Sequence, residues 1–133
     1  MTRAWLALGS NVGDRADYLQ ATRQCLPTLG VAVIQASRVA ETAPVGVTDQ
    51  PGFLNQVLEV ETGLGPRSLL ETVKRLEVTL GRQPRERWGP REIDIDILRY
   101  DDRAVDEPGL QIPHPELPNR PFLLDLLAEV LSP

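Results

Sequence analysis

The chain has 133 residues, of which 41% are hydrophobic and 25% charged, and its formal net charge is −5. This composition excludes disordered, collagen-like and disulfide-stapled chains, and the length predicts one domain over residues 1–133. No apolar run approaches the roughly 18 residues that a membrane-spanning helix needs, and the acidic balance argues against nucleic acid or a membrane as partner. The single cysteine, Cys25, cannot form an internal disulfide, so we expect a cytoplasmic protein.

The first part of the chain predicts a strand, a tight turn and a helix. Residues 3–8 are apolar enough for a buried first strand, and the turn GSNVGD follows at 9–14. Asp14 is placed to cap a helix over 15–29, because aspartate is a favoured N-terminal cap. Gly30 ends this helix, since glycine readily adopts the conformation that follows a helix.

The middle of the chain predicts two more strands and a second helix. Residues 31–42 are rich in β-forming residues and predict the second strand. The segment 43–52 has two prolines and two glycines and predicts a loop, and the alternating segment 53–62 predicts the third strand. Pro66 suits the start of a helix, whose apolar stripe ends at Gly81.

The remaining residues predict a basic loop, a fourth strand and a terminal helix. The loop 82–91 has four arginines and one glutamate, which favours a specific small anion as ligand. Residues 92–98 alternate strictly and predict a strand, whereas the proline-rich segment 112–121 predicts a rigid connection to a short helix over 122–131. The predicted order is βαββαβ, which indicates an α+β, ferredoxin-like fold: an antiparallel sheet with helices packed on it and a short C-terminal helix.

Asp94 and Asp96 give the clearest indication of a functional site. Side chains alternate along a strand, so both carboxylates share one face and Ile93, Ile95 and Ile97 share the other. Residues i and i+2 lie roughly 6.5–7 Å apart, and such carboxylates can bind two Mg²⁺ ions about 4 Å apart. The alternative is an acidic face on a half-solvated strand. The arginine loop just before the pair favours a metal site, because phosphoryl transfer uses metals and arginines together.

The other candidates are weaker when taken one at a time. The chain has only two phenylalanines, Phe53 and Phe122, and Asn55 shares the strand face of Phe53. Two rings and an amide suit a flat, hydrogen-bonding heterocycle, although core packing is the usual role of phenylalanine. His114 could reach a phosphate or be an incidental surface residue, and Glu77 could bind a ligand or only form an ion pair. The turn GSNVG matches no phosphate-binding pattern and predicts a tight turn alone.

Seven strings occur in this order along the chain: ALGSNVGDR, ETAPVG, QPGFLNQV, RLEVTLGR, ERWGPREIDIDIL, IPHPEL and NRPFLL. Together they closely resemble the 6-hydroxymethyl-7,8-dihydropterin pyrophosphokinase family of folate biosynthesis, from Leu6 to about Leu127. The most specific string is RWGPR followed by alternating aliphatic residues and aspartates. The resemblance implies a ferredoxin-like fold and a monomer that transfers diphosphate from ATP to the hydroxymethyl group of the dihydropterin, releasing AMP.

The resemblance also implies roles for individual residues. Two aspartates match the pair that binds two Mg²⁺ ions, and with two arginines they form the implied catalytic set: Asp94, Asp96, Arg82 and Arg91. The implied ATP contacts are Glu77, Arg82, Trp88, Arg91, His114 and Arg120. The implied pterin contacts are Thr42, Pro44, Val45, Gly46, Phe53, Asn55 and Phe122. The chain departs from the family pattern in a short arginine loop, which leaves the role of Arg85 open, and in Lys74, where some members have glutamine.

Two other classes of protein fit parts of the sequence. A ferredoxin-like RNA-binding module would explain Trp88 among arginines, but it would have a basic balance and an RNP-like string, and the sequence has neither. A non-catalytic regulatory nucleotide-binding domain would explain the arginine loop, but it would not need Asp94 and Asp96. We therefore predict an enzyme with ATP as co-substrate, and the regulatory domain is the alternative.

Overall fold

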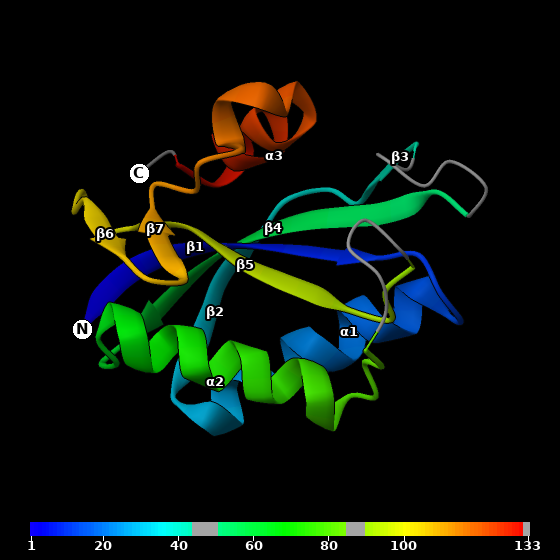
Figure 1. Cartoon of the computed structure of the whole chain (residues 1–133), viewed down its shortest axis with the longest axis horizontal. Helices are drawn as coiled ribbons and strands as arrows, with labels where there is room; N and C mark the ends of the chain where they lie inside the picture. Colours follow the sequence, from blue (N-terminus) through cyan, green and yellow to red (C-terminus); the bar gives the residue numbers. More distant parts are fainter. Residues whose placement is uncertain (44–50, 85–89, 132–133) are drawn as a thin grey trace.

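An antiparallel sheet of five strands forms the centre of the molecule (Figure 1). The computed structural model describes residues 1–43, 51–84 and 90–131. The strands of the sheet are β1 (Thr2–Ser10), β2 (Val31–Ala36), β3 (Ala40–Thr42), β4 (Phe53–Thr62) and β5 (Asp94–Tyr100). Their order is β2-β4-β1-β5, and β3 pairs with the beginning of β4. Helices and an antiparallel sheet together make the fold α+β, as the sequence predicts.

Helices cover both faces of this sheet (Figure 1). The helices α1 (Arg15–Cys25) and α2 (Pro66–Thr79) lie on one face, and α3 (Pro121–Leu131) lies on the other. Alternation along β1 supplies a core to each face: Leu6 and Leu8 pack toward α1 and α2, whereas Trp5 and Ala7 pack toward α3. No helix within the described ranges is long and apolar enough to span a bilayer.

The first helix begins as predicted but changes form before its predicted end. The Asp14 side chain accepts a hydrogen bond from the Asp17 N–H at 3.1 Å, which confirms the predicted cap. The α-helix ends at Cys25, and a 3₁₀ turn continues to Leu29. Pro27 explains the change, because it has no N–H to extend the helical hydrogen bonding. Gly30 then ends the turn with φ = 84°, as predicted.

The predicted strand 31–42 is in fact two strands, β2 and β3. They pair successively with the long strand β4, and between them Ser37 bonds to Val57 through its backbone N–H (2.8 Å) and its hydroxyl (2.9 Å). Such a break depends on a partner about twenty residues away, so a local pattern does not reveal it.

The predicted strand 92–98 begins and ends two residues later, as β5 (Asp94–Tyr100). Beyond it lies a hairpin that the sequence analysis did not predict, formed by β6 (Val105–Glu107) and β7 (Leu110–Ile112). Its strands are too short to show a period. They are joined through Gly109, which has φ = 73°.

Candidate active site

Asp94 and Asp96 project from the same face of β5, on the side of the sheet that α3 covers. The isoleucines that alternate with them, Ile93, Ile95 and Ile97, are buried in the core beneath α1 and α2. The predicted division of this strand is therefore confirmed. Because β5 is the last strand in the order of the sheet, the carboxylates stand at an edge that a ligand can approach.

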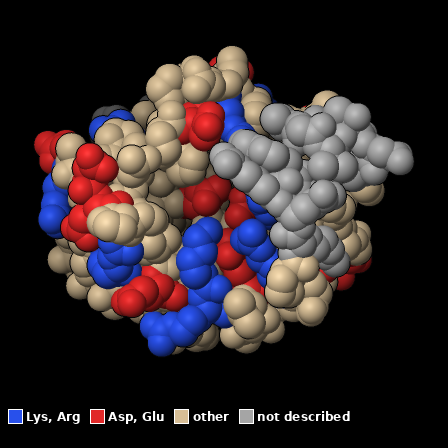
Figure 2. All heavy atoms as spheres, in the orientation of Figure 1, with Lys and Arg blue, Asp and Glu red and all other residues tan. Residues whose placement is uncertain are grey.

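Arginines from the two ends of the basic loop converge on Asp94. The Arg82 guanidinium lies 3.1 Å from Asp94 Oδ1, and the Arg91 guanidinium lies 3.6 Å from Asp94 Oδ2. Arg82 follows α2 and Arg91 precedes β5, so the chain brings both to one carboxylate. In the space-filling view, acidic and basic side chains lie side by side in a hollow between α2 and α3 (Figure 2).

Glu77 and Lys74 of α2 form hydrogen bonds to the backbone of β5 at its free edge, at Ile95 between the two aspartates. Glu77 accepts a hydrogen bond from the Ile95 N–H at 2.6 Å, and Lys74 donates one to the Ile95 carbonyl at 2.7 Å. Because unpaired backbone groups at a sheet edge need partners, these two side chains replace a neighbouring strand. Lys74 also lies 3.1 Å from Glu77 and 3.5 Å from Asp96.

Glu77 has little capacity left for a ligand. Its side chain is 4% exposed, one oxygen faces Lys74 and the Ile95 N–H, and the other accepts a hydrogen bond from Arg82 at 2.8 Å. The sequence resemblance implies an ATP contact for Glu77. Its hydrogen bonds indicate that Glu77 positions Arg82 and β5. A direct contact with the nucleotide stays a prediction.

The charges around the two aspartates move their pKa values in opposite directions. Burial opposes ionisation of Asp94, but the cations Lys74, Arg91 and Arg82 outweigh it and lower its pKa. Burial raises the pKa of Asp96, and the charge of Asp94 raises it further. One carboxylate is therefore held firmly ionised beside another whose ionisation is costly. An added divalent cation would remove that cost.

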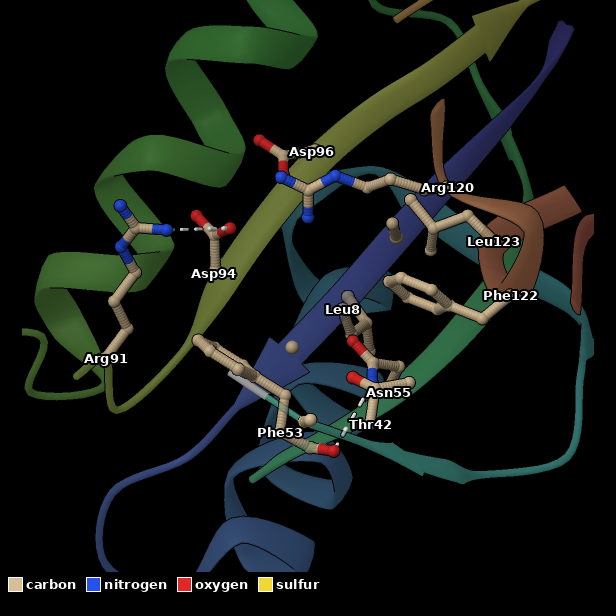
Figure 3. A pocket seen from close by; sticks show the side chains of 13 residues that line it. Leu8, Thr42, Phe53, Asn55, Arg91, Asp94, Asp96, Arg120, Phe122 and Leu123 are labelled. Carbon is tan, nitrogen blue, oxygen red and sulfur yellow. Dashed lines mark hydrogen bonds and ion pairs between the residues drawn. The ribbon is translucent and has the colours of Figure 1, made fainter. Parts of the chain in front are cut away.

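An aromatic pocket lies beside the aspartates, between the sheet and the start of α3. Phe53 and Phe122 stand at opposite sides of it (Figure 3). Asn55 and Thr42 are joined by a hydrogen bond of 2.8 Å at its floor. The empty space between its lining residues is about 650 Å³, and this volume includes open solvent. Its lining also includes Ala7, Leu8, Gly9, Ala43, Arg91, Asp94, Asp96, Arg120 and Leu123.

Two further hollows adjoin the aromatic pocket. The arginine hollow is lined by basic and acidic side chains, among them Arg82, Arg91, Asp94, Asp96, His114 and Arg120. The outer hollow lies between α2 and the β6–β7 hairpin, and its lining includes Leu70, Lys74, Asp96, Ile97, Leu110, Gln111 and His114. Asp96 lines all three cavities. The three hollows therefore meet at this one carboxylate.

His114 is held in place by the backbone around it. Its N–H donates to the Leu98 carbonyl at 3.0 Å, and its ring Nδ1 accepts from the Glu116 N–H at 3.1 Å. With Nδ1 occupied as an acceptor, Nε2 carries the proton of the neutral ring. The side chain can thus present a hydrogen-bond donor toward the arginine hollow.

The structure gathers most of the predicted site residues into these adjoining cavities. Ten of them line the cavities: Thr42, Phe53, Asn55, Arg82, Arg91, Asp94, Asp96, His114, Arg120 and Phe122. Glu77 lies beneath them. Pro44, Val45, Gly46, Arg85 and Trp88 lie outside the described residues. The hydrogen bonds from Lys74 and Glu77 to β5 were not predicted, although the i, i+3 spacing of these residues on α2 indicates that both face one neighbour.

The donor set around the aspartates fits magnesium that arrives with a polyphosphate. Within the described part of the chain, no three histidine, cysteine or carboxylate side chains form a metal-binding group. Mg²⁺ is commonly bound through only one or two carboxylates, with waters and substrate phosphates completing its shell. Two carboxylates on one strand face, with arginines beside them, meet that requirement.

Comparison with known proteins agrees with this chemistry. A relative from Bacillus subtilis, named 2-amino-4-hydroxy-6-hydroxymethyldihydropteridine pyrophosphokinase, is 44% identical over 128 residues, which cover 96% of this chain and 77% of the relative. Proteins of the same name from Methylorubrum extorquens and Aquifex aeolicus are 44% and 42% identical, and the matches cover 98% of this chain and 83% and 81% of theirs. Residues 5–132 match the family model described as 7,8-dihydro-6-hydroxymethylpterin-pyrophosphokinase, and the chain belongs to this family.

Proposed function

We propose how this pyrophosphokinase of folate biosynthesis distributes its two substrates among the three hollows. The aromatic pocket takes 6-hydroxymethyl-7,8-dihydropterin, the arginine hollow takes the phosphates of ATP, and the outer hollow takes the nucleoside. The observation that carries the proposal is the position of Asp96, which lines all three cavities. A group transferred from one substrate to the other has to pass such a junction.

The aromatic pocket suits a pterin in shape and in polarity. The rings of Phe53 and Phe122 face each other across it (Figure 3), so a flat heterocycle can stack between them. Asn55 and Thr42 offer an amide and a hydroxyl to the polar edge of the heterocycle. Gly9 leaves space at the floor of the pocket. A Cβ there would fill this space, in contact with the Phe53 ring at 3.5 Å and the Asn55 amide oxygen at 3.6 Å.

The arginine hollow suits the triphosphate. Arg82, Arg91 and Arg120 supply planar guanidinium groups that can bind phosphate oxygens through paired hydrogen bonds. The present partners of Arg82 and Arg91 are carboxylates, so the incoming phosphates would exchange one anionic partner for another at these two arginines. His114 adds a donor at the wall shared with the outer hollow.

The reaction is an in-line displacement at the β-phosphorus. The hydroxymethyl oxygen of the pterin forms a bond to that phosphorus, the bond between the β-phosphorus and the α,β-bridging oxygen breaks, and AMP leaves with the bridging oxygen. The hydroxyl proton passes to solvent. Bound by Asp94 and Asp96, two magnesium ions would neutralise the polyphosphate and acidify the hydroxyl. The arginines stabilise the charge on the transferred group, and alignment of two large substrates supplies much of the rate.

Several broader features belong to the same proposal. The strand order β2-β4-β1-β5 supports a ferredoxin-like arrangement, in which the two central strands are the first and third of four. Both hydrophobic cores share that sheet, which supports one domain over residues 1–133. We also propose that the enzyme acts as a monomer in the cytoplasm, where the lone Cys25 stays a thiol.

One assay tests the function directly. The protein is mixed with ATP, Mg²⁺ and 6-hydroxymethyl-7,8-dihydropterin, and the nucleotides are separated over time. We expect AMP to appear one-for-one with pterin diphosphate. ADP in place of AMP would contradict attack at the β-phosphorus. Bound but unchanged ATP would instead favour the regulatory domain.

A further inference from the structure

Asn11, in the turn between β1 and α1, has a buried side chain that bonds to two distant segments. Its Oδ1 accepts a hydrogen bond from the Arg91 N–H at 2.7 Å, and its Nδ2 donates one to the Pro51 carbonyl at 3.1 Å. Its own backbone N–H donates to the Arg91 carbonyl at 3.0 Å. Asn11 is 0% exposed, so these bonds are shielded from water in this structure.

The two partners of Asn11 belong to different halves of the site. Pro51 stands two residues before Phe53, which lines the aromatic pocket at the start of β4. Arg91 itself lines the arginine hollow and lies 3.6 Å from Asp94 at the start of β5. The register of the sheet brings these strand ends together, since Gly9 and Ser10 of β1 pair with Asp94 and Leu54.

We propose that Asn11 is a positioning residue that couples the pterin half of the site to the nucleotide half. The inference rests on the proposed function, since it assigns those two ligands to the aromatic pocket and the arginine hollow. A ligand that fixes the start of β4 also fixes the Asn11 amide, and this amide holds the Arg91 backbone in place. The second ligand then meets a segment that is already ordered, so it binds more tightly.

The beginning of α1 strengthens the hold on the pterin side. The Arg15 guanidinium donates to the Gly52 carbonyl at 2.8 Å and to the Glu41 carboxylate at 2.7 Å. The turn and the helix that follows it therefore form hydrogen bonds with two consecutive residues, Pro51 and Gly52. Movement at the start of β4 is transmitted to Asn11 instead of being absorbed between them.

Isothermal titration calorimetry measures the coupling directly. The dissociation constant of the dihydropterin is determined with and without saturating Mg²⁺ and an ATP analogue whose α,β-bridge is methylene, which cannot react. We expect a coupling factor of about 5-fold or more in the unmodified protein. Asn11→Asp keeps the acceptor for Arg91 but removes the donor to Pro51. The loss of this bond should lower the coupling factor at least about 2-fold, toward 1, while the affinity for each ligand alone changes less.

Ser10→Ala is the matched control, because Ser10 is as buried as its neighbour and its hydroxyl has no hydrogen-bond partner among the described residues. It should keep the coupling of the unmodified protein. Equal coupling in Asn11→Asp and the unmodified protein would overturn the proposal, and so would an unmodified protein without coupling. Formation of AMP from ATP by the same preparation shows whether the proposed function itself stands.

A measurement on the unmodified protein covers the case in which Asn11→Asp does not fold. Hydrogen exchange at the Arg91 amide, the donor to Asn11, is followed with the dihydropterin alone. Slower exchange at this position in the nucleotide half would support the coupling. An unchanged exchange rate would refute it.

Discussion

Asp96→Asn separates the contribution of the acidic pair to catalysis from its contribution to stability. The substitution keeps the shape of the side chain and removes one charge at the junction of the three hollows. We expect turnover to fall by more than about 100-fold, because even the residues that orient a metal ligand are worth 10- to 100-fold. The protein should stay folded, because the charge of Asp96 works against the folded state.

The expected stability follows from two opposing effects. The contact that is lost joins Asp96 to Lys74 at 3.5 Å, and these side chains are 35% and 40% exposed, so it is worth at most about 1 kcal/mol. The gain comes from the raised pKa of Asp96, caused by burial and by the Asp94 charge. A raised carboxyl pKa means that ionisation favours the unfolded chain, so a neutral asparagine recovers stability at neutral pH. The two effects have opposite signs, and we expect a melting temperature within about 4 °C of the original.

The assay pairs initial rates of AMP formation with thermal unfolding of the protein free of ligands. Asp102→Asn is the control, because it makes the same chemical change at an exposed residue of the turn that follows β5. It should leave both quantities unchanged. An Asp96→Asn variant that kept a tenth of the activity would refute the metal site. One that lost more than about 2 kcal/mol of unfolding free energy would refute the charge argument.

Three further substitutions test other parts of the molecule. Phe122→Ala should weaken dihydropterin binding by 10-fold or more (about 1.4 kcal/mol) and leave the affinity for nucleotide alone unchanged; calorimetry with each ligand checks both. Glu77→Gln should become more stable relative to the original protein as pH rises from about 4 to 7, because burial raises the Glu77 pKa and ionisation then costs stability. Urea unfolding across that range measures the difference in unfolding free energy, and a difference that changes in the opposite direction would contradict this. Trp5→Phe removes the donor to the Val130 carbonyl (3.0 Å) and should cost about 1–3 kcal/mol, and an unchanged urea midpoint would contradict this.

Signals local to a few residues gave correct predictions. The Asp14 cap follows from the preference of aspartate for the start of a helix. The two faces of β5 and the common face of Phe53 and Asn55 follow from the period of a strand. The arginine loop beside Asp94 was visible because its parts are adjacent in the sequence.

Features that depend on distant partners were not predicted. Ser37 interrupts the predicted second strand because Val57 bonds to it, and no pattern within 31–42 contains that information. Asn11 was taken as part of a tight turn, because its partners lie 40 and 80 residues further along the chain. Glu77 was expected to bind a ligand or to form an ion pair; it forms ion pairs with Lys74 and Arg82, but its bond to the Ile95 N–H at the free edge of β5 was not foreseen.

The alternation along β5 restricts where this family can gain or lose residues. Leu8 stands opposite Ile95 and Ala7 opposite Asp96 in the register with β1. Deleting one residue within β5 would move every later side chain of the strand to the opposite face of the sheet. Carboxylates would then lie in the hydrophobic core and isoleucines in the active site. In the turn between β6 and β7, by contrast, an extra residue reverses no such order. We therefore expect natural variants to have insertions and deletions in that turn but not within β5. Amino-acid substitutions within β5 can still occur, because they do not change its register.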